Sequence, residues 1–367
     1  MISLSKPIIS IKEIAAVKNV LKSGLLAQGE KVRILEEKFS QYCKMKHAVA
    51  FNSGTAAIHA GLYALGIQPG DEVITTPFTF VATANPICML GAKVIFTDIS
   101  EKDFNIDPAG IEKKITKKTK AVIPVDLYGQ IYNYARINSI AKKYNLKILE
   151  DACQSIGASQ NGKKSGNFGN IAAFSLYATK NIMCGEGGLI TTNDSKIAEK
   201  CKLFRHHGQS EKTRYEYWDL GYNYRMTDLA AAIAIEQLKK LDIFNKKRIR
   251  NAEKLSAGLK NIKGLLLPRV MEGNMHVFHQ YTIRITNQAK YTRDELMQFL
   301  NKNKIGCGVY YPKPLHLHPY FRKMGYKEGD FPLSEKLSKE VLSLPVHPRL
   351  GLKDINYIIK AIKYYAK

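Results

Sequence analysis

FSLYATKN at residues 174–181, followed by CGEGG at residues 184–188, is the most informative stretch of the chain. It places one lysine, Lys180, between an apolar strand candidate and a glycine-rich turn. A lysine at the end of a strand, beside hydroxyl and backbone donors, is suited to form a Schiff base with an aldehyde, because desolvation lowers its pKa and frees the amine. The alternative is an ordinary solvated lysine, so the assignment depends on the motifs that accompany Lys180.

The length and composition of the chain are typical of a globular enzyme. Its 367 residues, 45% of them hydrophobic, are enough for a large and a small domain. The first residues lack a basic region followed by a long apolar run, and no stretch reaches eighteen apolar residues without a polar interruption. We therefore expect a soluble, cytoplasmic protein that does not bind membranes. Six cysteines without a CxxC pair predict reduced thiols rather than disulfides or a zinc site.

The formal net charge of +24 raises the question of nucleic-acid binding. The lysines, however, are spread along the whole chain in short clusters, and no nucleic-acid motif accompanies them. The charge predicts a solvated basic surface that also attracts anionic metabolites, and we expect no nucleic-acid partner.

Strand and helix patterns alternate over the first two thirds of the chain. Such alternation predicts an α/β fold with crossover connections and a mostly parallel central sheet. The predicted strands are residues 47–51, 72–76, 93–98, 121–127, 146–150, 171–177 and 189–192. The alternation stops after a helix over 229–241, and a long basic helix over 243–259 leads into a second region. We predict a large domain over residues 1–242 and a smaller α+β domain over 243–367.

Two further motifs follow predicted strands, where open α/β sheets bind their ligands. NSGTAA at residues 52–57 begins a helix, and its unpaired amides and small side chains suit a phosphate, although an ordinary helix cap has the same pattern. EDACQ at residues 150–154 places Asp151 where a buried carboxylate needs a cationic partner. A protonated pyridine nitrogen would supply that charge, and a structural capping Asp is the alternative. Phe80, also after a strand, could stack on such a ring or belong to the core.

Taken together, the motifs NSGTAA, TTPFTFVATAN, PVDLYGQ, ILEDACQSIGA, AAFSLYATKN, GEGG, GYNYRMTDLAAAI and VYYPKPLHL resemble those of the DegT/DnrJ/EryC1/StrS sugar aminotransferases. The resemblance runs from SKPIIS near the start to LSLPVHP near the end, so it covers essentially the whole chain. It implies fold type I and the cofactor pyridoxal 5′-phosphate, with pyridoxamine phosphate as an intermediate form.

The resemblance also implies roles for individual residues. Lys180 matches the lysine that carries the cofactor as a Schiff base and moves the proton, and Asp151 matches the partner of the pyridine nitrogen. The other residues that match the cofactor site are Gly54, Thr55 and Ser175 around the phosphate, Phe80 on the ring and Gln154 near the phenolic oxygen. Asn223 matches an asparagine that reaches the phosphate from the neighbouring subunit, which implies a homodimer with shared active sites.

Substrate contacts are predicted for three further residues. Arg225 could bind a substrate carboxylate or form a structural salt bridge. Tyr311 and His316, in VYYPKPLHL, are predicted to face the sugar nucleotide. Asp126 stands where many members have histidine, which leaves its role open. The histidine pairs at 276/279 and 316/318 do not form a convincing ligand set, and no metal is expected.

The function predicted by the resemblance is transfer of an amino group from L-glutamate to a nucleotide-linked keto sugar, giving an amino sugar and 2-oxoglutarate. The alternatives are a sugar dehydratase or an aminohydroxybenzoate-type synthase of the same fold, and a non-catalytic regulator. Dehydrating relatives replace the Schiff-base lysine with histidine, so Lys180 favours transamination. Motifs typical of amination at sugar carbon 4 and at carbon 3 both occur, and the nucleotide is not specified.

Overall fold

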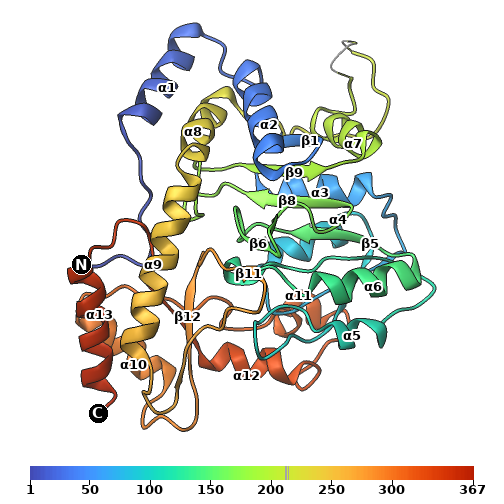
Figure 1. Cartoon of the computed structure of the whole chain (residues 1–367). Helices are drawn as coiled ribbons and strands as arrows, with labels where there is room; N and C mark the ends of the chain where they lie inside the picture. Colours follow the sequence, from blue (N-terminus) through green and yellow to red (C-terminus); the bar gives the residue numbers. More distant parts are fainter. Residues whose placement is uncertain (211–212, 214) are drawn as a thin grey trace.

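A seven-stranded sheet forms the centre of the molecule in the computed structural model, which describes residues 1–210, 213 and 215–367 (Figure 1). The spatial order is β1-β9-β8-β5-β4-β2-β3. The strands are β1 (His47–Phe51), β2 (Glu72–Thr75), β3 (Lys93–Phe96), β4 (Thr119–Val122), β5 (Lys147–Asp151), β8 (Ile171–Ser175) and β9 (Gly188–Thr192). β9 runs antiparallel to both neighbours and the other pairs are parallel, which confirms the predicted mostly parallel sheet.

All seven predicted strands lie in this sheet, and their ends differ by a few residues from the prediction. The largest difference is at β4, which ends at Val122 rather than at 127. Pro124 follows shortly after and has no amide hydrogen to donate to a neighbouring strand. Directly after Pro124, the chain meets the sheet through an isolated bridge between Val125 and Asp151.

Helices cover both faces of the sheet, which explains why its strands read as continuous apolar runs. Neighbouring residues on β5 show the two faces, since Ile148 and Leu149 pack into different hydrophobic clusters. One face is covered by α3 (Gly54–Ala64), α4 (Asn85–Met89) and α7 (Ser195–Arg205), and the other by α2 (Glu30–Cys43), α6 (Tyr134–Tyr144) and α8 (Asp228–Leu238). α1 (Ile11–Ser23) packs on α8, and α5 (Pro108–Glu112) on α6.

The long helix α9 (Leu241–Leu259) connects this layered unit to a smaller one (Figure 1). The smaller unit has an antiparallel sheet of β10 (Leu265–Leu266), β12 (Tyr281–Ile285) and β13 (Val341–Leu344), packed with α10 (Arg293–Lys302) and α13 (Leu352–Tyr365). α9 begins two residues before the predicted helix, and the domain division at 242/243 stays a prediction.

The first residues of the chain lie against the smaller unit. The amide of Ile2 donates to the carbonyl of Lys304 at 2.8 Å, and the carbonyl of Ile2 accepts from Gly306 at 2.7 Å. The chain therefore begins beside residues 304–306, passes through the layered unit and returns along α9. Figure 1 shows both termini on the side of the molecule that carries α13.

The remaining elements are short and connect the larger ones. They are β6 (Ser159–Gln160), β7 (Lys163–Lys164), β11 (Asn274–Met275), α11 (Pro319–Arg322), α12 (Pro332–Glu340) and the 3₁₀ turns η1 (Val81–Thr83), η2 (Leu127–Gly129) and η3 (Leu315–Leu317). Within the described ranges, no helix combines the length and the apolar character needed to cross a membrane.

Candidate active site

Most of the residues predicted for the cofactor site meet in one cavity of about 510 Å³. The cavity lies at the carboxyl ends of β1, β2, β5 and β8, where open α/β sheets bind ligands. The predicted residues that line it are Gly54, Thr55, Phe80, Asp151, Gln154, Ser175, Lys180 and Tyr311. Segments separated by more than 250 residues in the sequence thus contribute to a single site.

Lys180 lies in the turn after β8, and its backbone amide donates to the carbonyl of Tyr177 at 2.9 Å. Burial lowers the pKa of the Lys180 ammonium, while the neighbouring Cys153 and Asp151 act in the opposite direction. A lowered pKa increases the fraction of free amine at neutral pH, which is the form that attacks a carbonyl carbon.

Asp151 ends β5 with its carboxylate almost fully buried. One oxygen accepts a hydrogen bond from the hydroxyl of Thr83 at 2.7 Å, and the other from the amide of Cys153 at 3.2 Å. Thr83 is in turn 3.0 Å from the hydroxyl of Thr79, so two threonines after β2 hold the carboxylate in place. The result is a fixed negative charge at the wall of the cavity, suited to a cationic ligand group.

The N-terminus of α3 forms a narrow cradle beside β8. Ser53 caps the helix, its hydroxyl accepting from the amide of Ala56 at 3.1 Å, as the sequence predicts. A Cβ atom on Gly54 would lie 2.9 Å from Cβ of Ser175 and 3.3 Å from Sγ of Cys153, so glycine allows the start of α3 to pack this closely against β8. Amides at a helix N-terminus with an open approach are suited to an anion such as phosphate.

Gln154 joins the two parts of the cavity wall. Its side-chain oxygen accepts from the amide of Tyr128 at 3.0 Å, and its side-chain nitrogen donates to the hydroxyl of Tyr311 at 3.0 Å. Tyr311 has a left-handed backbone (φ 64°), a strained conformation for a bulky residue that often marks a functional loop. Phe80 also lines the cavity and is 60% exposed, which leaves its ring available to stack on a flat ligand.

Two of the other predicted residues lie outside this cavity. Asn223 is exposed, and its carbonyl accepts from Asn52 at 3.4 Å. The guanidinium of Arg225 lies 2.6 Å from Nδ1 of His206, so within the chain it has a structural partner. Neither placement tests a role in a second subunit or toward a substrate, and both roles stay predictions.

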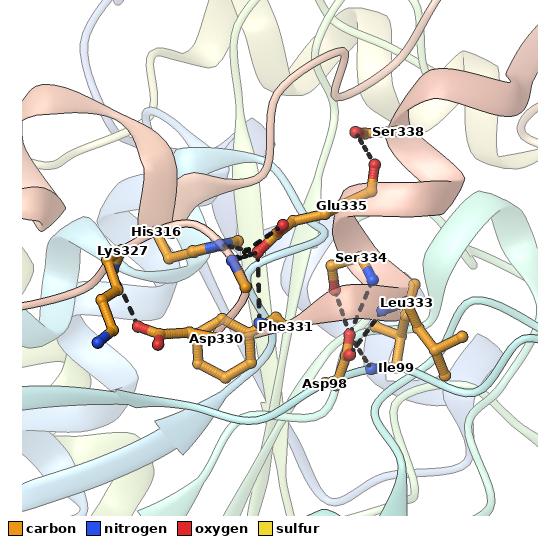
Figure 2. Close-up of polar contacts among 11 residues, drawn as sticks. Asp98, Ile99, His316, Lys327, Asp330, Phe331, Leu333, Ser334, Glu335 and Ser338 are labelled. Atoms are coloured by element: carbon orange, nitrogen blue, oxygen red, sulfur yellow. Dashed lines mark hydrogen bonds and ion pairs between the residues drawn. The ribbon is translucent and has the colours of Figure 1, made fainter.

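The placement of His316 corrects the expectation that its side chain faces the sugar nucleotide. The imidazole is fully buried behind the loop, and Nε2 lies 2.9 Å from a carboxylate oxygen of Glu335 (Figure 2). Its neighbours Leu315 and His318 line a second cavity, whereas His316 does not. Sequence alone shows which residues a loop contains, but not which of them turns inward.

Several residues of the cavity were not identified from sequence. Thr83 holds Asp151, and Tyr310, His279 and Glu186 line the wall. Thr83 lies within TTPFTFVATAN, and a hydroxyl residue shortly after a strand was the available signal. His279 is buried, and burial together with the charge of Lys180 lowers its pKa well below the usual range, so it is neutral at pH 7.

Asp126, whose role the sequence left open, is a structural residue in the interior. Its carboxyl group accepts from the hydroxyl of Ser155 at 2.6 Å and from the amide of Tyr132 at 3.2 Å. Burial and the nearby Glu150 raise the pKa of Asp126 well above its usual range. Across residues 1–210, 213 and 215–367, no cluster of three His, Cys, Asp or Glu side chains could hold a metal ion.

The fold and the cavity define a fold type I enzyme of the aminotransferase class. The chain belongs to the DegT/DnrJ/EryC1/StrS aminotransferase family, whose sequence profile matches residues 7–363. The predicted family and fold are therefore confirmed.

Curated relatives match nearly the whole chain. It is 45% identical to the pleiotropic regulatory protein of Geobacillus stearothermophilus, with 94% of this chain and 91% of the relative covered. It is 39% identical to GDP-perosamine synthase of Caulobacter vibrioides, with 89% and 88% covered. It is 37% identical to UDP-2-acetamido-2-deoxy-3-oxo-D-glucuronate aminotransferase of Pseudomonas aeruginosa, with 95% and 94% covered.

Solved structures share the fold closely. DesV of S. venezuelae, solved in complex with a ketimine intermediate, has a TM-score of 0.93 at 34% identity, with 97% of this chain and 94% of that chain covered. The PLP-form of the putative sugar aminotransferase Spr1654 of Streptococcus pneumoniae has a TM-score of 0.93 at 28% identity, with 100% and 98% covered.

Proposed function

We propose that this protein transfers an amino group from L-glutamate to a nucleotide-linked keto sugar. One observation carries the proposal: Lys180, Asp151 and the N-terminus of α3 line the same cavity at the carboxyl edge of the sheet. An amine of lowered pKa, a fixed carboxylate and an anion cradle are the three groups that a phosphorylated pyridine aldehyde needs.

The cofactor is pyridoxal 5′-phosphate, and the residues present fit it. The N-terminus of α3, which lines the cavity together with Ser175, would suit the phosphate, and the carboxylate of Asp151 would suit the ring nitrogen. When bound, the cofactor acts as an electron sink that stabilises negative charge on the carbon losing a proton.

The side chains of the cavity have distinct roles in this reaction. Lys180 would hold the cofactor in the resting enzyme, and its free amine would then remove and return a proton as a general base and acid. Asp151, held by Thr83, would stabilise a positive charge on the ring nitrogen. Phe80 would stack on the ring, and Gln154, which contacts Tyr311, would offer its amide to the ring oxygen.

A second cavity of about 810 Å³ adjoins the first and supports a large second substrate. Thr79, Phe80, Tyr310 and Tyr311 line both cavities, so the two cavities lie side by side. The two relatives named above as a perosamine synthase and an oxo-glucuronate aminotransferase carry GDP and UDP in their names, which favours a nucleotide sugar here. The sugar, the nucleotide and the aminated carbon are not assigned.

The active enzyme in this proposal is a homodimer. Asn223 is exposed outside the cavity of its own chain, as expected for a residue that completes the phosphate site of a second copy. Arg225, two residues away, is proposed to serve a substrate carboxylate at the same shared site.

An absorbance experiment tests the core of the proposal. Purified protein should carry the yellow band of bound pyridoxal phosphate, and L-glutamate should bleach it. Lys180→Ala should lose the bleaching, whereas Lys353→Ala, at an exposed position on α13, should keep it. A bleaching response that survives in Lys180→Ala would contradict the assignment.

A non-catalytic regulator is the second candidate, because the relative that is 45% identical is named as a regulatory protein. The cavity opposes this function, since it retains Lys180, Asp151 and Gln154 together. A panel of UDP-, dTDP- and GDP-linked keto sugars distinguishes the aminotransferase from the regulator. The panel is incubated with protein that L-glutamate has converted to the pyridoxamine phosphate form. Amino sugar formation supports the aminotransferase, and its absence with every member supports the regulator.

A further inference from the structure

A buried histidine connects the loop that lines both cavities, residues 309–318, to the helix α12. His316 lies in η3 with its side chain fully buried, and Nε2 is 2.9 Å from Oε1 of Glu335 on α12 (Figure 2). Its ring also packs edge-on against Phe331, with the ring centres 4.8 Å apart. His316 therefore joins the loop to α12 without facing either cavity.

The carboxylate of Glu335 gathers several donors from separate segments. Besides His316, Oε1 accepts from the amide of Gly329 at 2.9 Å and from the amide of Phe331 at 3.4 Å, and Oε2 accepts from Gly329 at 3.1 Å. One side chain thus holds η3 against the turn that precedes α12 (Figure 2). The side chain of Glu335 is 12% exposed, whereas the imidazole is fully buried, so removing this carboxylate would leave a buried imidazole without its partner, which is costly.

Two other acidic residues lie near His316, and both bind other groups. Asp98 accepts from the amides of Leu333 and Ser334 and from the Ser334 hydroxyl, and Asp330 accepts from the amide of Lys327. Burial lowers the pKa of His316, so the ring is neutral and donates from Nε2 to Glu335. Within the described chain, Nδ1 of this histidine has no hydrogen-bond partner.

The residues around His316 form the wall of the larger cavity. Leu315 and His318 line it, together with Tyr310, Tyr311 and Lys313 from the same loop. The amide of Leu315 also donates to the carbonyl of Pro77 at 2.8 Å, next to the segment that carries Thr79 and Phe80. A shift of η3 would therefore move both the loop and its contact with the cofactor side.

We propose that Glu335, acting through His316, is a positioning residue that fixes the loop 309–318 and thereby sets the affinity for the nucleotide keto sugar. This inference rests on the proposed function for its substrate. Neither side chain touches the ligand. Their effect comes from holding Tyr310, Tyr311 and Lys313 in the arrangement that the substrate meets.

Amide hydrogen exchange on the holoenzyme tests the positioning directly. In Glu335→Ala, exchange should become faster in residues 309–318, while residues 171–192 of the cofactor side stay as in wild type. In Glu335→Gln, the amide oxygen can take the place of Oε1 and accept from His316, Gly329 and Phe331, and only the contact of Oε2 with the exposed Gly329 is lost, so exchange should stay closer to wild type than in Glu335→Ala. Glu328→Gln, an exposed carboxylate in the neighbouring turn, is the matched control.

Steady-state kinetics with a keto sugar from the UDP, dTDP and GDP panel tests the consequence. Because small displacements of positioning groups weaken binding strongly, KM for the keto sugar should rise about tenfold in Glu335→Ala with kcat within about twofold, and Glu335→Gln should restore KM. A lower kcat at unchanged KM would show a merely structural residue and overturn the proposal.

The two proposals fail in different ways. Wild type that converts no member of the panel would count against the proposed function, whereas the exchange experiment would still decide the positioning role. Exchange that is unchanged in residues 309–318, or equally faster throughout the chain, would overturn the positioning role even if the protein is an aminotransferase.

Discussion

The hydroxyl of Thr83 donates to the carboxylate of Asp151 at 2.7 Å across 68 residues of sequence. Thr83 ends the 3₁₀ turn η1 that follows β2, and Asp151 ends β5, with β4 between these two strands in the sheet. This bond fixes the direction of the carboxylate before any ligand arrives. An already oriented charge needs no rearrangement during the reaction, which is how enzymes stabilise charge efficiently.

Replacing Thr83 by Val should therefore weaken catalysis while keeping the shape of the side chain. A hydrogen bond to an ionised carboxylate stabilises it by about 1.5–3 kcal/mol, so we expect kcat to fall roughly tenfold. Thr83→Ser, which keeps the hydroxyl, should stay near wild type. Turnover of L-glutamate in single-turnover absorbance measurements checks this, and equal rates for the Val and Ser variants would contradict it.

Gly54→Ala should reduce the affinity for pyridoxal phosphate. The added methyl group would lie 2.9 Å from Cβ of Ser175, so the cradle must widen or lose its anion. We expect the dissociation constant to rise by at least about tenfold, because a misplaced phosphate loses charge-assisted hydrogen bonds to the helix amides. Cofactor titration of the apoenzyme measures it. Gly351→Ala, where the new Cβ has no neighbour closer than 3.6 Å, should bind as wild type.

Mixed dimers should show whether the active sites are shared. Lys180→Ala and Asn223→Ala should each be nearly inactive alone. If Asn223 serves the neighbouring subunit, a hybrid of the two variants contains one complete site and should regain about half of wild-type activity per dimer, as two independent sites predict. Differently tagged chains allow the hybrid to be purified. Activity no higher than the average of the two parents would place Asn223 in its own subunit's site.

Acid should destabilise the protein through its buried histidines, and His59 offers a clean test. Burial lowers the pKa of His59 from 6.5 to about 4. Between these values the unfolded chain binds more protons than the folded one, so the free energy of unfolding falls as the pH is lowered, by at most about 1.4 kcal/mol per pH unit.

His59→Leu removes this titration. The variant loses the contact of Nδ1 with the Tyr224 hydroxyl at every pH, but its stability relative to wild type should improve on going from pH 7 to pH 5. Urea unfolding of the apoenzymes at both pH values measures the difference. A stability gap that is equal at pH 7 and pH 5 would show that His59 does not titrate in this range.

Much of the fold could be predicted from the sequence because local patterns determine it. The apolar runs of β1 and β8 and the helix start within NSGTAA are visible in the chain and are confirmed. The antiparallel direction of β9 could not be read in this way, since an apolar strand looks the same in either direction.

The meeting of Lys180, Asp151 and Gly54 in one cavity could be anticipated for a different reason, while their roles toward the cofactor stay predictions. Lys180, Asp151 and Gly54 each follow a strand, and the family motifs identify them individually. The side chain of His316 is expected from sequence to face the substrate because its neighbours do, since Leu315 and His318 line the larger cavity. In the 3₁₀ turn η3, however, the middle residue points into the interior. Sequence alone does not identify Thr83, because its partner lies on another strand and only the order of strands in the sheet brings the two together.

The hydrogen bonds of Ile2 with Lys304 and Gly306 have a consequence for protein engineering. Because residue 2 pairs with residues 304 and 306, the smaller unit includes segments that are far apart in the sequence, and residues 241–367 alone do not contain all of its contacts. A fragment that begins at α9 lacks the backbone hydrogen bonds that Ile2 forms with Lys304 and Gly306. An affinity tag fused directly before Met1 would lie beside these hydrogen bonds. Residues 1 and 367 lie on the same side of the molecule (Figure 1). A circular permutation that joins them would keep the hydrogen bonds of Ile2 and provide new termini elsewhere.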